Sequence, residues 1–208
     1  QAAMWQAMLM SAGLAPSKQI MIHGFINVNG QKMSKSLGNV FNPGEIVDEY
    51  WVDALRYFLA RHINPFEDSD FTVERFKEAY NAGLANGLGN LVARIMQLAQ
   101  TNLQEAVEID LETYPKEYSE LLNNFEFSKA IDFVWSKIQK LDQFITTAQP
   151  FKVVKENKEE GQKLIREAVI ELLVVSKLLE PFMPETSKYI QRDIKLNKKP
   201  ENLFPRKA

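Results

Sequence analysis

Cysteine is absent from the 208-residue chain, and histidine occurs only twice, at His23 and His62. Without cysteine the chain can form neither disulfides nor a zinc site with thiolate ligands. Two histidines are also a poor basis for a histidine-based metal cluster. We therefore expect no metal site in this chain, and the lack of cysteine fits a reducing compartment such as the cytoplasm.

Long apolar runs and a large excess of one charge are also missing. The longest apolar stretch, residues 168–179, is interrupted by Glu171 and Lys177 and is shorter than the roughly 20 residues of a membrane-spanning helix. The net charge is −2, whereas proteins that bind nucleic acid over their whole surface usually carry a basic excess. We therefore expect no membrane segment and only local contacts to any nucleic acid. The basic residues within 188–207 either make such a contact or only solubilise the chain end.

Apolar residues at helical spacing dominate the chain. Hydrophobic residues make up 45% and charged residues 25%, which suits one large domain or two small ones with a real core. The first helical pattern begins at once, without an initiator Met or a secretory signal, and indicates a cut through a longer domain. The predicted helices cover residues 4–12, 42–50, 52–63, 73–84, 85–103, 118–123, 128–147, 158–179 and 185–194.

Two short strands are predicted near the N-terminus. Residues 18–23 are apolar and partly β-branched, and residues 25–28 lead into Asn29-Gly30, a pair that favours a hairpin turn because both residues tolerate positive φ. The fold class is therefore mainly α. A small α/β unit over residues 1–65 precedes an antiparallel helical bundle over residues 66–208.

The loop after the hairpin turn carries residues that suit phosphate binding. Lys32 and Lys35 can neutralise phosphate charge, and Ser34 and Ser36 can donate hydrogen bonds. A bare pair of lysines three residues apart is more often a solvated hairpin. The residue types alone therefore leave the function of the loop open.

A longer match gives the loop a function. Residues 31–40, Gln-Lys-Met-Ser-Lys-Ser-Leu-Gly-Asn-Val, resemble the KMSKS signature of class I aminoacyl-tRNA synthetases, and the resemblance continues through residues 42–43 and 52–57. In that family the loop closes over ATP and stabilises the pyrophosphate as the aminoacyl adenylate forms. The resemblance implies that Lys35 binds the triphosphate with support from Lys32, and that the serines belong to the same catalytic loop. It also implies that His23 and Gly24 border the adenosine site.

The flanks of the loop are similar to the methionyl branch of this family. The similar segments are residues 8–14, 18–20, 70–72, 86–91, 181–186 and 203–206. The resemblance implies a remnant of the Rossmann catalytic domain and stem-contact region, followed by a bundle that binds the anticodon. It further implies ATP with Mg²⁺ and methionine as substrates, tRNA(Met) as partner, and a cytoplasmic ligase whose zinc lies upstream of this chain. The alternatives are a valyl, leucyl or isoleucyl enzyme, and a non-catalytic tRNA-binding module.

The resemblance also implies which residues contact the CAU anticodon. Asn90 and Arg94 lie one helical turn apart and match the two residues that methionyl enzymes present to the anticodon bases. Phe151 stands where these enzymes usually have a tryptophan that stacks on a base, so we expect weaker stacking. Without the resemblance, all three would be interpreted as packing or surface residues.

Two features depart from the family pattern. Trp51 occupies a position where Gly is common, so the turn there must differ or carry strain. The chain also contains no His-x-Gly-His motif, which class I enzymes need for ATP. We therefore expect this segment alone to form no adenylate.

Overall fold

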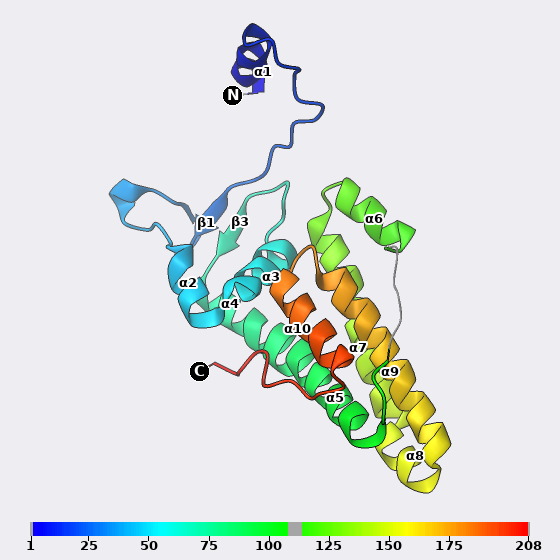
Figure 1. Cartoon of the computed structure of the whole chain (residues 1–208). Helices are drawn as coiled ribbons and strands as arrows, with labels where there is room; N and C mark the ends of the chain where they lie inside the picture. The colour runs from blue at the N-terminus through cyan, green and yellow to red at the C-terminus, as the bar shows by residue number, and fades with distance from the viewer. Residues whose placement is uncertain (1, 108–113, 208) are drawn as a thin grey trace.

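Most of the chain folds into helices, as the apolar spacing predicts. The structure is a computed structural model that describes residues 2–107 and 114–207 (Figure 1). The helical elements are α1 Ala2–Ser11, η1 Lys35–Leu37, α2 Pro43–Tyr50, α3 Val52–His62, α4 Val73–Ala79, η2 Tyr80–Gly89, α5 Asn90–Asn102, α6 Lys116–Asn123, α7 Phe127–Ala148, α8 Pro150–Glu156, α9 Lys158–Leu179 and α10 Pro184–Lys195. None of the helices in these two ranges is long and apolar enough to cross a membrane.

The sheet is small and contains one strand that the sequence did not predict. The hairpin of β1 (Ile26–Val28) and β2 (Gln31–Lys32) is confirmed, with β3 (Ser69–Phe71) parallel to β1 on its other edge. The acidic residues around β3 suggest a turn, yet two of their carboxylates accept backbone hydrogen bonds from the hairpin. Asp68 Oδ1 accepts from Phe25 N at 2.8 Å, and Asp70 Oδ1 accepts from Gly30 N at 2.7 Å.

The predicted strand over residues 18–23 is wrong. This segment has no strand conformation and does not join the β2-β1-β3 sheet. Ile20 and Ile22 remain 49% and 78% exposed, and no apolar face holds the segment in place. Helix α1 before it is confirmed and ends ahead of Gly13, at φ 71°, but it buries no side chain and projects from the body (Figure 1).

One long helical run replaces the two helices predicted over residues 73–103. Elements α4, η2 and α5 follow one another without a break, and the middle element has π-type hydrogen bonding. Gly83 in η2 faces the Tyr57 hydroxyl, with which any Cβ at this position would collide. Such wide turns inside helices are frequent at functional sites, and this one ends directly before Asn90.

The bundle packs α5, α7 and α10 against the central α9, which is bounded as predicted (Figure 1). Its core is built from fully buried aliphatic side chains such as Ile95, Ile131, Leu172 and Ile190. The sequence missed α8. Gln149, at φ 45°, ends α7, and Pro150 then starts a new helix, because proline suits the first helical position. The domain boundary at residue 65 stays a prediction, and the β1–β3 pairing joins residues from both sides of it.

A buried carboxylate joins the α/β part to the last helix of the bundle. Asp53, fully buried in α3, accepts hydrogen bonds at its Oδ2 from Thr186 N at 2.7 Å and from Thr186 Oγ1 at 2.8 Å. Arg56 donates to the carbonyl oxygens of Phe182 at 2.6 Å and Pro181 at 2.8 Å. Two segments more than 120 residues apart in sequence are thus fixed to each other.

Replacing Asp53 with alanine should lower the free energy of unfolding by about 2 kcal/mol, because two buried donors of Thr186 lose their acceptor. For a chain of this size the melting temperature should fall by roughly 4–8 °C. Thermal unfolding followed by circular dichroism measures the change. The exposed Asp48 of α2 provides the control, since Asp48→Ala removes the same charge without breaking a buried contact. Equal melting temperatures for the two variants would contradict this role of Asp53.

Candidate nucleotide-binding loop and RNA-binding hollow

The loop after β2 is held in shape by its own side chains. Asn29 and Gly30 both have positive φ, 53° and 73°, as the hairpin turn requires. Asn39 closes the loop, because its Oδ1 accepts from Ser34 N at 2.8 Å and its Nδ2 donates to Lys32 O at 3.2 Å. Gly38 ends η1 in the left-handed region, at φ 66°. These contacts explain why Gly and Asn follow the lysines and serines.

The charged groups of this loop point to solvent. Lys32 and Lys35 are exposed, and neither takes part in an ion pair among the described residues. Lys32 Nζ lies 4.2 Å from the centre of the Phe25 ring, and the hydroxyls of Ser34 and Ser36 are 2.8 Å apart. The loop therefore presents two uncompensated cations beside two hydroxyls, which suits a polyphosphate.

His23 and Gly24 lie on the segment that enters β1. Gly24 N donates to Pro65 O at 3.2 Å, and a Cβ at this glycine would collide with the carbonyl oxygen of Glu67. Close backbone approach therefore requires glycine here. His23 is exposed, and its Nδ1 lies 2.8 Å from Gly24 O. The described residues supply it with no other hydrogen bond, which leaves the ring available to a ligand.

The structure brings Asn90, Arg94 and Phe151 around one hollow of about 360 Å³. Asn90 and Arg94 project from successive turns of α5, while Phe151 comes from the first turn of α8 and is 40% exposed. Three predicted residues from two distant segments thus share a single surface. Their further neighbours in the hollow are Ala93, Gln97, Leu98, Ile145 and Lys199. Sequence analysis missed Gln97, although its position one turn after Arg94 was a usable signal. Lys199 belongs to the basic stretch 188–207, for which a nucleic-acid contact was one of two interpretations.

Arg94 is oriented by an acidic residue of the neighbouring helix. Its Nη1 lies 2.7 Å from Asp142 Oδ1 in α7, and its side chain is 38% exposed. Only one guanidinium edge is occupied by this ion pair, so the remaining donors face the hollow or solvent. An arginine held in this way can offer a planar donor set to a base without losing much side-chain freedom on binding.

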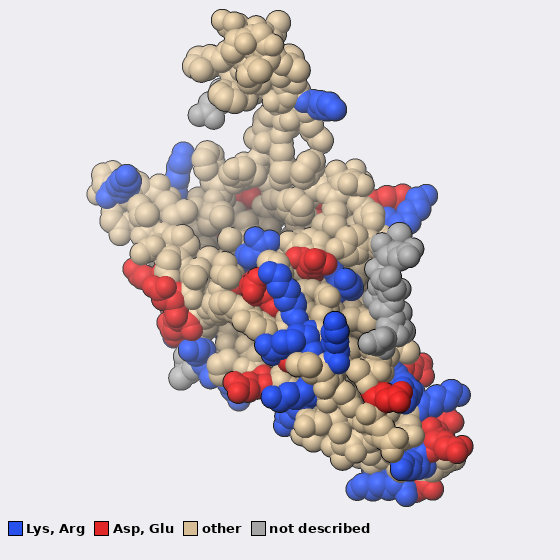
Figure 2. Space-filling view, viewed as in Figure 1, with Lys and Arg blue, Asp and Glu red and all other residues tan. Residues whose placement is uncertain are grey.

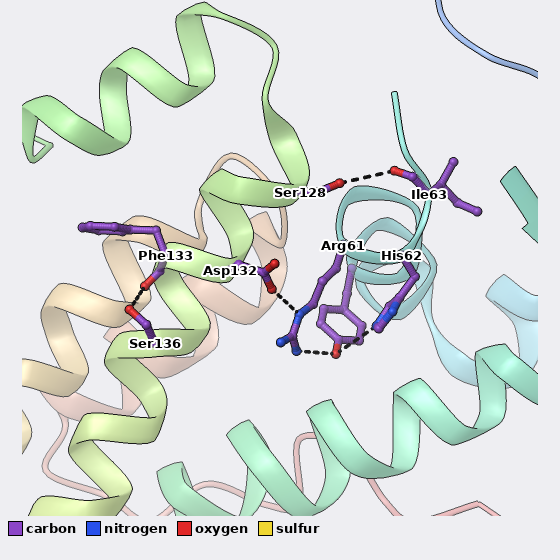
Figure 3. A network of polar contacts seen from close by, with 8 residues as sticks. Arg61, His62, Ile63, Ser128, Asp132, Phe133 and Ser136 are labelled. Atoms are coloured by element: carbon purple, nitrogen blue, oxygen red, sulfur yellow. Dashed lines mark hydrogen bonds and ion pairs between the residues drawn. The ribbon is translucent and has the colours of Figure 1, made fainter. Parts of the chain in front are cut away.

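A wider hollow of about 640 Å³ extends the same surface between η2, α3 and α7. Arg61 donates from Nε to Asp132 Oδ1 at 2.8 Å (Figure 3). Its Nη1 donates to the Tyr57 hydroxyl at 3.0 Å. Burial, together with the charges of Arg61 and Arg75, lowers the pKa of His62. Asn90 and Arg94 line this hollow too, so the two hollows adjoin at these residues.

Trp51 adopts the strained backbone that the sequence indicated. Its φ of 75° and ψ of 152° fall in a region that glycine occupies almost alone, at a cost of about 1–3 kcal/mol for other residues. The indole packs against Tyr189 and Phe204, with ring centres 5.6 Å and 6.2 Å apart. Aromatic packing offsets part of the backbone strain.

Metal-binding groups do not gather in the part of the chain that the structure describes. Within residues 2–107 and 114–207 there is no group of three His, Cys, Asp or Glu side chains that could hold a metal ion.

Comparison with known proteins assigns both parts of the chain. Residues 1–96 match the family described as tRNA synthetases class I (M), and residues 97–206 match the anticodon binding domain of methionyl tRNA ligase. A methionine–tRNA ligase of Caldanaerobacter subterraneus subsp. tengcongensis is 34% identical over 88% of this chain and 31% of its own length. That of Thermotoga maritima is 34% identical over 94% of this chain and 33% of its own length. The chain thus spans about a third of these relatives.

Solved structures agree with the sequence comparison. Mycobacterium tuberculosis methionyl-tRNA synthetase in complex with methionyl-adenylate has a TM-score of 0.77 and 26% identity, over 98% of this chain and 47% of that one. A second structure of the same enzyme, bound by methionyl-adenylate, gives a TM-score of 0.73 and 25% identity over 99% and 46% of the two chains. The fold and the sequence therefore indicate the same relatives.

Proposed function

Because the chain belongs to the methionyl-tRNA synthetase family of class I aminoacyl-tRNA synthetases, we propose that it works as part of a methionine–tRNA ligase. The ligase activates methionine with ATP and transfers it to tRNA(Met). The observation that carries the proposal is the convergence of Asn90, Arg94 and Phe151 on one hollow, in a chain that also keeps an uncompensated Lys32–Lys35 loop.

The loop supplies charge where the pyrophosphate leaves. Attack of the methionine carboxylate on the α-phosphorus forms the adenylate and moves negative charge onto the departing β- and γ-phosphates. Lys35, with Lys32 beside it, neutralises that charge, and Ser34 and Ser36 donate hydrogen bonds to phosphate oxygens. His23 and Gly24 border the adenosine. ATP enters with Mg²⁺ as substrate, and any zinc of the enzyme is bound outside these residues.

The hollow supplies recognition of the CAU anticodon. Arg94 and Asn90 have donor and acceptor groups that suit the edges of unstacked bases, and Phe151 offers a face for stacking. Lys199 adds a positive charge for the RNA backbone. The ion pair to Asp142 supports this assignment, since it fixes the direction of the Arg94 side chain before RNA binds. We place the enzyme in the cytoplasm, where tRNA is charged.

A chimeric enzyme tests the proposal. The 208 residues would replace the matching third of the Thermotoga maritima methionine–tRNA ligase. The rest of that enzyme contributes the upstream catalytic part. We expect this chimera to charge tRNA(Met) with methionine and to discriminate against tRNAs with other anticodons. The 208-residue chain alone, the matched control, should show no methionine-dependent pyrophosphate exchange. A folded chimera that binds ATP and methionine but charges no tRNA would contradict the proposal.

A further inference from the structure

A second aromatic and basic cleft lies beside the hollow that we assign to the anticodon. It has a volume of about 750 Å³ and separates α10 from the C-terminal segment 196–203. Figure 2 shows Lys and Arg side chains gathered across this face, over α10 and the C-terminal segment of Figure 1. The cleft itself contains Arg192, Lys198 and Lys199 against the carboxylates of Asp193 and Glu201. Positive charge is therefore in excess.

Strained Trp51 forms one wall of this cleft, next to Tyr189. A backbone that only glycine adopts freely persists where the side chain is used, either for packing or for binding. The Trp51 indole is only half-buried, and Tyr189 remains 37% exposed. Both rings thus keep exposed surface at the cleft, where the Arg192 guanidinium lies 4.9 Å from the centre of the Tyr189 ring.

Asp193 lines the cleft and holds Arg192 in place. Its side chain is 3% exposed, and Oδ1 accepts from Arg192 at 2.8 Å and 2.9 Å. Oδ2 is buried and has no hydrogen-bond partner among the described residues. Because the carboxylate is buried, the polar group that it fixes at the cleft is the exposed Arg192 guanidinium.

Lys199 links the cleft to the Asn90–Arg94–Phe151 hollow because it lines both. Its position is fixed, since its backbone N–H donates to Gln100 Oε1 at 2.9 Å, and Asn197 Nδ2 donates to Leu103 O at 2.9 Å. An RNA strand with bases in the hollow can therefore pass over Lys199 and reach the cleft with its next nucleotides.

We propose that the cleft of Trp51, Tyr189, Asp193 and Lys198 binds a further nucleotide of the anticodon loop, outside the CAU triplet. The base stacks on the aromatic wall, while Arg192, Lys198 and Lys199 contact the flanking phosphates. This inference rests on the proposed function, because it requires the same RNA to occupy the neighbouring hollow.

Abasic RNA hairpins test the proposal on the 208-residue chain by fluorescence anisotropy. Each hairpin carries the CAU triplet and lacks one base elsewhere in the loop. We expect one such position to weaken binding of the wild-type chain by about tenfold, the effect of losing a stacked base. Trp51→Gly places at φ 75° a residue that suits this backbone, and it should weaken binding of the intact hairpin by the same factor of about ten. In this variant, removing the base at the sensitive position should cause no further loss of affinity. Its preference for CAU should remain.

Lys198→Ala tests the same cleft without touching the packed rings. Lys198 is exposed and absent from the anticodon hollow, so this variant should bind the hairpin less tightly and with a salt slope smaller by about one. Lys116→Ala on α6, 89% exposed, is the matched control and should change neither. The proposal would be overturned if both Trp51→Gly and Lys198→Ala bound the hairpin with wild-type affinity. It would also be overturned if the chain bound free nucleotides but no abasic hairpin bound more weakly than the intact one. Loss of CAU preference by the wild-type chain would instead overturn the proposed function.

Discussion

Replacing Lys35 with alanine should lower the rate of adenylate formation by at least 100-fold in the chimeric ligase, with little change in melting temperature. A preorganised cation or donor aimed at developing charge is typically worth about 100- to 1000-fold in kcat. Lys35 is exposed and takes part in no ion pair among residues 2–107 and 114–207, so its removal breaks no contact that stabilises the fold. Methionine-dependent pyrophosphate exchange measures the effect directly.

Two further variants test whether the effect depends on the position of the lysine in the loop or only on the loss of one positive charge. Lys32→Ala should cost less, because Lys32 already rests on the Phe25 ring and only supports Lys35. Lys18→Ala removes an equally exposed lysine outside the loop and should leave the exchange rate unchanged. A Lys35→Ala enzyme that exchanges pyrophosphate at the rate of the Lys18→Ala enzyme would show that the loop does not stabilise the leaving group.

Replacing Arg94 with alanine should weaken binding of a CAU hairpin by roughly 10- to 100-fold, the range expected for one planar donor set on a base. Hairpins with another base in the triplet bind weakly from the start, so their affinity should change little. The variant therefore loses discrimination as well as affinity. Competition between labelled CAU and unlabelled mutant hairpins reports both quantities.

The partner of Arg94 supplies a matched control. Asp142→Asn keeps Arg94 but weakens the 2.7 Å ion pair that orients it. We expect an intermediate loss of affinity, because the arginine must then be ordered when RNA binds. Arg94→Lys should not restore discrimination, since an ammonium group lacks the planar donor set. Equal discrimination by the Arg94→Ala variant and the wild-type chain would exclude Arg94 from base recognition.

Local patterns were enough to predict most of the helices, though not α8, and the hairpin turn before the loop. The apolar spacing of residues 158–179 and the Asn29-Gly30 turn each specify one conformation through contacts close in sequence. The anticodon residues needed the resemblance to a family. Nothing local to Asn90 or Phe151 indicates that α5 and α8 meet at one hollow, because that proximity arises from the tertiary packing of both helices on α9.

The missed features depend on long-range contacts. Strand β3 forms only because β1 offers a free edge, although its acidic residues favour a turn. Residues 18–23 have strand-like composition but lie outside the β2-β1-β3 sheet. Lys199 reaches the hollow because Gln100 and Leu103 of the α5 end fix the C-terminal segment. Trp51 was flagged by its unusual residue type, yet the cleft that it lines could be found only in three dimensions.

The most direct test of the account is the affinity of the 208-residue chain for a set of hairpins that differ only in the anticodon triplet. Anisotropy titrations at one fixed salt concentration keep the electrostatic contribution constant. The account predicts that the CAU hairpin binds at least tenfold more tightly than any single-base variant, and that Arg94→Ala removes this difference at the base that Arg94 contacts. Equal affinity for all triplets, or tighter binding of a triplet other than CAU, would contradict it.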